Sequence, residues 1–152
     1  MLSPESPGGG NIMSVSKYNS EGYYDPTTHA ALTNIENKEK RAKFRPIVYI
    51  CSPFSGDVEG NTANARRYCR FAVDRGCIPI APHLLFPQFM NDADEAERDL
   101  ALFMGIVLLT KCAELWAFGG SISPGMAREI RKAETRGIPI RHFTTDCEEV
   151  LQ

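Results

Sequence analysis

The sequence lacks several features that would place it at once in a large class of proteins. Its net charge is only -2, so no excess of basic residues marks a general binder of nucleic acid or of membranes. No apolar stretch reaches the roughly 18 residues that cross a bilayer, and no apolar run near the amino terminus resembles a signal peptide. The three histidines are scattered, without the spacing of metal ligands. We therefore expect no membrane segment, no nucleic-acid polymer as partner, no metal and no cofactor.

The five cysteines also lack a recognisable pattern. They form no C-x-x-C pair, and their odd number leaves one cysteine without a partner. Most of them lie among apolar residues, where a thiol behaves as a small hydrophobic group. This usage favours a reducing compartment, so we expect a cytoplasmic protein.

The length and composition that are present fit one globular domain with an addition at its amino-terminal side. With 152 residues, 43% apolar and 24% charged, the chain can bury a core of ordinary size. Residues 1–12 are rich in Pro, Gly and Ser and are expected to be disordered. Residues 13–45 are polar and predict a partly helical appendage, with a helix from about Thr28 to Lys43. Residues 46–152 are expected to form the α/β domain.

Four short β-prone runs alternate with helical patterns in residues 46–152. They are 47–51, 77–81, 112–118 and 138–140. This alternation predicts a single doubly wound α/β domain, with a mainly parallel sheet of four to five strands like those of Rossmann and flavodoxin folds. Asn61 is expected to cap the helix after the first strand, and Ser123, followed by Pro124, the helix after the third.

Three loops should meet at the carboxyl edge of this sheet, where open parallel sheets bind ligands. They are residues 52–56, the segment from Pro82-His83 onward, and residues 119–125. The third loop enters a helix whose free N–H groups and positive dipole end suit a phosphate, although a capped helix needs no ligand. Glu129, Asp99 and Glu114 are acids of this region, and each is also ordinary as a surface residue. The residues alone thus predict a nucleotide-sized pocket with acids nearby.

Three blocks of sequence resemble the nucleoside 2-deoxyribosyltransferase-like superfamily, and in particular a bacterial and phage branch of it. They are Tyr49-Ile-Cys-Ser-Pro-Phe-Ser-Gly56, Arg98-Asp99-Leu100 and Ser123-Pro-Gly-Met-Ala-Arg-Glu129. The blocks occur in the order of the superfamily, and the resemblance extends from about Ile47 to Phe143. It implies a small-molecule nucleotide or nucleoside as ligand.

The resemblance also implies roles for residues at matching positions. Glu129 would attack C1′ of a sugar, Asp99 would assist departure of the base or orient the sugar hydroxyls, and Glu114 falls near a third acid. Transferases of the superfamily carry an acid at the position of Ser123, whereas the related nucleotide N-hydrolases carry a serine that contacts the 5′-phosphate. This difference favours a nucleoside 5′-monophosphate. The expected substrate contacts are Ser123 with Tyr49, Ser52, Pro53, Phe54, Ser55, Gly56, His83, Gly119, Gly120, Gly125 and Met126.

Three functions remain open at this point. The first is an N-glycosidase or deoxyribosyltransferase that acts on a (deoxy)nucleoside monophosphate. The second is a non-catalytic protein that binds a nucleotide or a nucleotide-derived signal, and the third is an interaction protein of a mobile element that acts through residues 13–45. The apolar stretch from Leu100 to Leu109 predicts self-association, and the resemblance implies a homodimer or a higher oligomer.

Overall fold

The computed structural model describes residues 26–151, which belong to two separate units. The first unit ends at Phe44, and its described part is helix α1 (Pro26–Lys43). This helix covers the segment that the sequence predicts as helical. The expected disordered segment 1–12, and the appendage up to residue 25, lie outside the described residues. The second unit begins at Arg45 and contains the α/β domain.

A five-stranded sheet forms the centre of the second unit, in the order β2-β1-β3-β4-β5. The strands are β1 (Ile47–Cys51), β2 (Ile78–Ile80), β3 (Glu114–Phe118), β4 (Ile140–Phe143) and β5 (Glu149–Val150). From β2 to β4 all neighbours are parallel, and β5 pairs antiparallel with β4. The predicted doubly wound, mainly parallel α/β fold is therefore confirmed.

The two central strands, β1 and β3, are buried on both faces, which explains why their sequences are short continuous apolar runs. Val48 of β1 pairs with Glu114 at one end of β3, and Cys51 pairs with Ala117 near the other. Because successive side chains of a strand point to opposite faces, each strand contributes to two separate cores.

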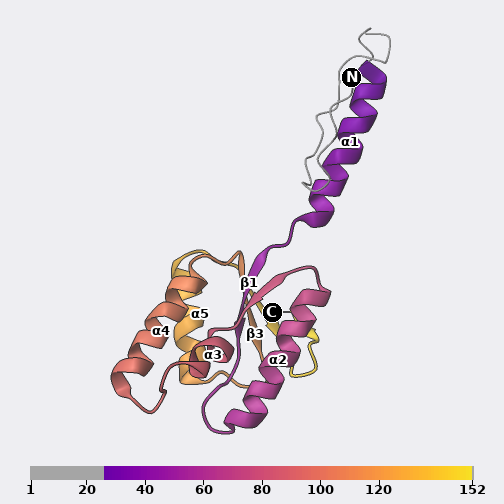
Figure 1. The fold of residues 1–152 in the computed structure, drawn as a ribbon. Helices are drawn as coiled ribbons and strands as arrows, with labels where there is room; N and C mark the ends of the chain where they lie inside the picture. The colour runs from indigo at the N-terminus through magenta and orange to yellow at the C-terminus, as the bar shows by residue number, and fades with distance from the viewer. Residues whose placement is uncertain (1–25, 152) are drawn as a thin grey trace. The chain divides into compact units, whose positions relative to one another are not determined.

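Helices cover both faces of the sheet (Figure 1). Helix α2 (Val58–Asp74) packs on one face, and helices α4 (Glu95–Leu109) and α5 (Pro124–Thr135) pack on the other. Between β2 and α4 the chain forms two short helices, α3 (Pro82–Leu85) and η1 (Phe86–Gln88). None of the helices described is long and apolar enough to cross a membrane.

The start of α2 differs from the prediction that Asn61 caps it. Asp57 is the cap, and its carboxylate accepts a hydrogen bond of 3.0 Å from the N–H of Gly60. A side chain at residue 60 would collide with this carboxylate, so glycine permits the earlier start. The amide of Asn61 instead donates to the carbonyls of Phe54 and Ser55, which holds the preceding loop against the helix.

The fourth strand also begins later than the predicted 138–140. It starts at Ile140, because Pro139 has no N–H with which to join the ladder as a donor. The carbonyl of Pro139 still accepts a hydrogen bond of 2.9 Å from the N–H of Leu115, so the proline marks the entry to the strand.

Candidate active site

The direction of the chain crossovers reverses between β1 and β3. From β1 the chain crosses through α2 to β2, and from β3 it crosses through α5 to β4 on the opposite side of the sheet. Open α/β sheets bind ligands at the carboxyl edge of such a point. A cavity of about 110 Å³ lies there, and five of the predicted site residues line it. They are Tyr49, Phe54, His83, Gly125 and Glu129.

Glu129 is the central acid of this cavity. It projects from the second turn of α5, and its Oε1 accepts a hydrogen bond of 2.9 Å from the Tyr49 hydroxyl in the middle of β1. Burial raises the pKa of Glu129, while hydrogen bonds from Cys51 and Tyr49 and the charge of Arg128 oppose this rise. A carboxylate that is partly shielded from water and supported by fixed donors is suited to nucleophilic attack.

Tyr49 acts in this pair only as a hydrogen-bond donor. Burial raises the pKa of Tyr49 far above its ordinary value, and the negative charge of Glu129 raises it further. The phenol therefore stays protonated in neutral solution. Its hydroxyl thereby fixes Oε1 of Glu129 within the cavity.

His83 forms a second polar pair beside the first. Its Nε2 lies 3.0 Å from the hydroxyl of Ser52, which is the buried residue after β1. Burial lowers the pKa of His83 to about 4, so the imidazole is neutral at neutral pH. The ring of Phe54 lies tilted toward it, with 6.2 Å between ring centroids. This pair offers a ligand a neutral hydrogen-bonding edge next to an aromatic face.

The rest of the cavity consists of an apolar wall and a charged rim. The wall comes largely from the α3–η1 segment and from α4, with Pro82, Phe86, Pro87, Met90, Ala101, Leu102, Gly105 and Ile106. The rim carries Asn91, Asp92, Glu97, Arg98 and Arg128. Sequence reasoning missed these rim residues, although Arg98 and Arg128 lie inside two of the blocks that carry the resemblance. Within residues 26–151, no group of three or more His, Cys, Asp or Glu is placed to hold a metal ion.

Asp99 is not among the residues that line the cavity. It lies in the second turn of α4 and is exposed, whereas its neighbours Glu97 and Arg98 contribute to the rim. A helix turns by about 100° per residue, so a shift of one position moves a side chain to a different face. Sequence spacing alone therefore does not establish which residue of this turn reaches the cavity.

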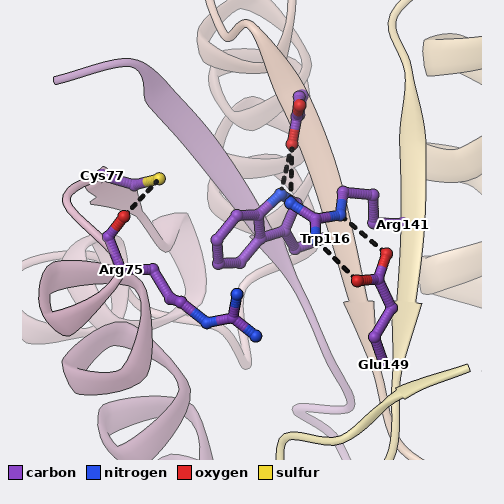
Figure 2. Close-up of polar contacts among 6 residues, drawn as sticks. Arg75, Cys77, Trp116, Arg141 and Glu149 are labelled. Atoms are coloured by element: carbon purple, nitrogen blue, oxygen red, sulfur yellow. Dashed lines mark hydrogen bonds and ion pairs between the residues drawn. The ribbon is translucent and has the colours of Figure 1, made fainter.

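Glu114 lies at the other end of the strands. It is the first residue of β3, at the amino edge of the sheet, whereas the cavity opens at the carboxyl edge. Its carboxylate accepts a hydrogen bond of 2.7 Å from the indole N–H of Trp116 and lies 3.8 Å from the guanidinium of Arg141. Figure 2 shows Trp116 and Arg141 side by side in this cluster, with Glu149 beyond them. The structure thus separates Glu114 from Glu129.

Three of the predicted substrate contacts line a different cavity, of about 190 Å³, on the α2 side of the sheet. They are Pro53, Gly119 and Gly120. The side chains of Asn61, Asn64 and Tyr68 from α2 complete this second cavity, together with Ser121 and Thr145. Ser55 and Gly56 are exposed in the loop before α2. The predicted set of contacts is therefore divided between two faces of the sheet.

The first turn of α5 offers fewer free donors than a typical helix start. Ser123 caps it as predicted, with its hydroxyl accepting a hydrogen bond of 3.2 Å from the N–H of Met126. Met126 is itself buried, and Pro124 has no N–H. The N–H of Gly125 is left without a backbone partner among the described residues, and Gly125 lines the first cavity.

The fold and the cavity together define an open α/β protein with flavodoxin-like strand order and a candidate active site at its crossover point. The chain belongs to the family described as Domain of unknown function (DUF7768), which matches residues 46–143. No curated protein matches it.

Among solved structures, the chain is similar to the 2-deoxyribosyltransferase of the psychrotolerant bacterium Bacillus psychrosaccharolyticus. The TM-score is 0.52 at 16% sequence identity, and the match covers 70% of this chain and 77% of that chain. That enzyme is described as a biocatalyst for the synthesis of antiviral and antitumoral nucleosides. The resemblance that the sequence predicts is therefore confirmed for the fold.

Proposed function

We propose that this protein cleaves or exchanges the N-glycosidic bond of a (deoxy)nucleoside 5′-monophosphate, with Glu129 as the nucleophile. The observation that carries the proposal is the partly buried Glu129 carboxylate, hydrogen-bonded to Tyr49 in a cavity at the crossover point. A 2-deoxyribosyltransferase of the same fold supports a nucleoside-like ligand. The five free cysteines support a reducing compartment, which in our proposal is the cytoplasm.

The reaction would proceed by two displacements at C1′ of the sugar. An oxygen of Glu129 forms a bond to C1′ while the C1′–N bond breaks. The electron pair of the C1′–N bond leaves with the base, which takes up a proton from water. Water or a second base then attacks C1′ and releases the Glu129 carboxylate. A covalent intermediate divides one difficult displacement into two easier ones. Tyr49 holds the carboxylate in one orientation through both steps.

The apolar wall of the cavity would hold the base. Phe54 and Phe86 present ring surfaces on which a planar base can stack, and the neutral imidazole of His83 lies near Phe54. Since His83 stays neutral, it would recognise the edge of the base by hydrogen bonding and would not supply a strongly acidic proton.

We further propose that the active form is a homodimer with α4 at the interface. Leu100, Phe103 and Val107 recur at helical spacing on α4, with 48%, 65% and 41% of their surfaces exposed. Asp99 precedes this stripe, so its expected role in departure of the base would depend on the partner. Light scattering of the parent and of Phe103→Lys tests this proposal. We expect the parent to be a dimer and Phe103→Lys to be a monomer, and a monomeric parent would contradict the proposal.

The reaction is tested with a panel of ribo- and deoxyribonucleoside 5′-monophosphates, by measuring release of the free base. We expect Glu129→Gln to lower turnover by about a thousandfold or more, because the amide is not a nucleophile. Glu134→Gln is the matched control, since Glu134 is an exposed glutamate on the same helix. Turnover that is unchanged in Glu129→Gln would exclude the proposed mechanism.

Stability serves as a second control for this variant. Burial raises the pKa of Glu129, so the folded protein favours an uncharged group at this position. This stabilisation is present below the pKa that Glu129 has in the unfolded chain. It is lost as pH rises through the pKa that Glu129 has in the folded protein. Glu129→Gln should therefore be at least as stable as the parent at neutral pH, and a loss of turnover is then not a loss of fold.

A non-catalytic nucleotide-binding protein is the second candidate function. It is favoured by the position of Asp99 outside the cavity, because departure of a base then lacks its expected acid. Equilibrium binding of a nucleotide that is recovered unaltered after long incubation would support this candidate over the enzyme.

A further inference from the structure

Two arginines from different helices lie on the rim of the cavity that contains Glu129. Arg98 comes from the first turns of α4, and Arg128 comes from α5 directly before Glu129. Both residues are exposed and line the same cavity. The charge of Arg128 favours ionised Glu129, but the proposed reaction at C1′ gives neither arginine a contact with the substrate, so their place at this rim needs a separate explanation.

The two arginines are not engaged by acids of the described residues. The ion pairs found within residues 26–151 involve other arginines, Arg70 and Arg141. Asp92 and Glu97 share the rim, but neither forms an ion pair with Arg98 or with Arg128. The guanidinium donors of the rim are therefore available to a ligand.

The rim offers two complementary kinds of hydrogen-bonding group. Guanidinium groups only donate and match the oxygens of a phosphate, whereas the carboxylates of Asp92 and Glu97 only accept and match sugar hydroxyls. A sugar phosphate carries both kinds of partner on one small scaffold. The N–H of Gly125 adds one more donor on the same side as Arg128.

We propose that Arg98 and Arg128, together with the N–H of Gly125, bind the 5′-phosphate and make the site prefer nucleoside monophosphates over nucleosides. The identity of the ligand rests on the proposed function. Ser123, the expected phosphate contact, does not line the cavity, and its hydroxyl already accepts the N–H of Met126. Cations on the rim therefore take the role that the resemblance implies for the serine.

Binding is measured by titration calorimetry on the full chain with Glu129→Gln, in which the ligand is not consumed. The probes are dAMP, dCMP, dGMP and dTMP, each compared with its own nucleoside. We expect tighter binding of at least one monophosphate by about tenfold or more, and a loss of about tenfold in Arg98→Gln and in Arg128→Gln. Affinity for the nucleoside should stay unchanged, and the preference for the monophosphate should weaken with added salt.

Two further variants separate recognition from a general effect of charge. Arg131→Gln removes an exposed arginine one turn further along α5, away from the cavity, and should bind all probes like the parent. Arg98→Lys keeps the positive charge but lacks the planar guanidinium group, so it should bind the monophosphate more tightly than Arg98→Gln and less tightly than the parent. Circular dichroism confirms that each variant is folded, as expected for exposed positions.

The outcomes distinguish this inference from the proposed reaction. A preference for monophosphates that depends on both arginines, without any release of base, supports the inference and contradicts the reaction. Release of base from nucleosides and monophosphates alike, unaffected by Arg98→Gln or Arg128→Gln, supports the reaction and overturns the inference. Failure of every probe to bind, or an equal loss in Arg131→Gln, also overturns the inference.

Discussion

The two faces of the central sheet are built from the same strands but have opposite character. On the α2 face, aromatic rings pack against one another: Tyr68 and Phe118 stack with 4.2 Å between centroids, and Phe118 and Phe143 with 5.0 Å. On the face of α4 and α5, the same layer contains Tyr49 and Glu129 beside an open cavity. Stacked aromatic rings fill the centre of the α2 face, whereas the other face holds partly buried polar groups beside the first cavity.

The alternation of side chains along β3 and β1 produces this difference. Trp116 and Phe118 of β3 point to the α2 face, while Leu115 and Ala117 point to the other. Ala117 and Cys51 are small residues in the core of the cavity face, close to Met126 in the first turn of α5. We call the α2 side of the sheet the aromatic face and the side of α4 and α5 the cavity face. Buried polar groups cost stability unless they are paired, so packing on the aromatic face must offset the free-energy cost of the polar groups on the cavity face.

The largest effect that would test this comparison is expected from Phe118→Ala. Phe118 is completely buried and contacts three aromatic neighbours, so its truncation should lower the free energy of unfolding by about 3–5 kcal/mol. Urea denaturation followed by circular dichroism measures it. Phe89→Ala, at an exposed ring after η1, is the control and should cost far less. Equal losses would show that the aromatic face is not the main source of stability.

The next effect concerns a titratable group on the cavity face, His83. Its pKa is lowered by burial to about 4, while the unfolded chain takes up a proton near 6.5. The contribution of neutral His83 to the free energy of unfolding is therefore fully present above pH 6.5. About 3 kcal/mol of this contribution is lost as pH falls toward 4. Denaturant titrations across this window should show a steeper fall for the parent than for His83→Gln.

The matched control for this pH dependence is His142→Gln, on β4 and away from the cavity. It removes a histidine outside the cavity, so a change of pH profile as large as that in His83→Gln would show that the effect is not specific to the cavity. A parent and a His83→Gln variant with parallel pH profiles would mean that His83 is not held neutral by the fold.

Most of the fold could be predicted from the sequence, because buried strands and capped helices leave local signals. The run at 47–51 matches β1 residue for residue, and Ser123 with Pro124 fixes the start of α5. The start of α2 could not be predicted in this way, because Asp57 and Asn61 are both good caps. A steric fact decides between them, namely the space for the Asp57 carboxylate beside Gly60.

The candidate site could be predicted only in part. Glu129, Tyr49 and His83 meet in one cavity because they follow or belong to strands whose carboxyl ends must converge. Which side of the sheet a loop residue faces depends on packing, and this separates Gly119 and Gly120 from Glu129. Likewise, the rotation of α4 places Arg98 on the rim and leaves Asp99 outside it.

A smaller effect is expected from Tyr49→Phe, which removes one hydroxyl from the cavity face. The hydrogen bond from Tyr49 helps to hold down the pKa of Glu129, so its loss should raise that pKa further. The acid limb of the pH profile for base release should then move to higher pH, and turnover should fall by about tenfold. An unchanged acid limb would show that the pair does not control the ionisation of Glu129.

The smallest effect is expected where the aromatic face meets solvent. Arg141 lies over the rings of Trp116 and Phe143, at 5.2 and 5.4 Å from their centroids, and makes two hydrogen bonds of 2.8 and 2.6 Å to Glu149 (Figure 2). Exposed ion pairs contribute little and are screened by salt, so Glu149→Gln should change stability less than any variant above.

The pH dependence of this pair has a defined sign. The hydrogen bond from Arg141 lowers the pKa of Glu149. The contribution of the pair to stability is therefore present above the ordinary carboxyl pKa, and it is lost as pH falls through the pKa of Glu149 in the folded protein. Fluorescence of Trp116, the single tryptophan, reports whether Arg141 still covers the ring, and Glu148→Gln is the exposed control. A loss of stability in Glu149→Gln as large as that in Phe118→Ala would mean that the strand β5, and not the stacked rings, closes this face.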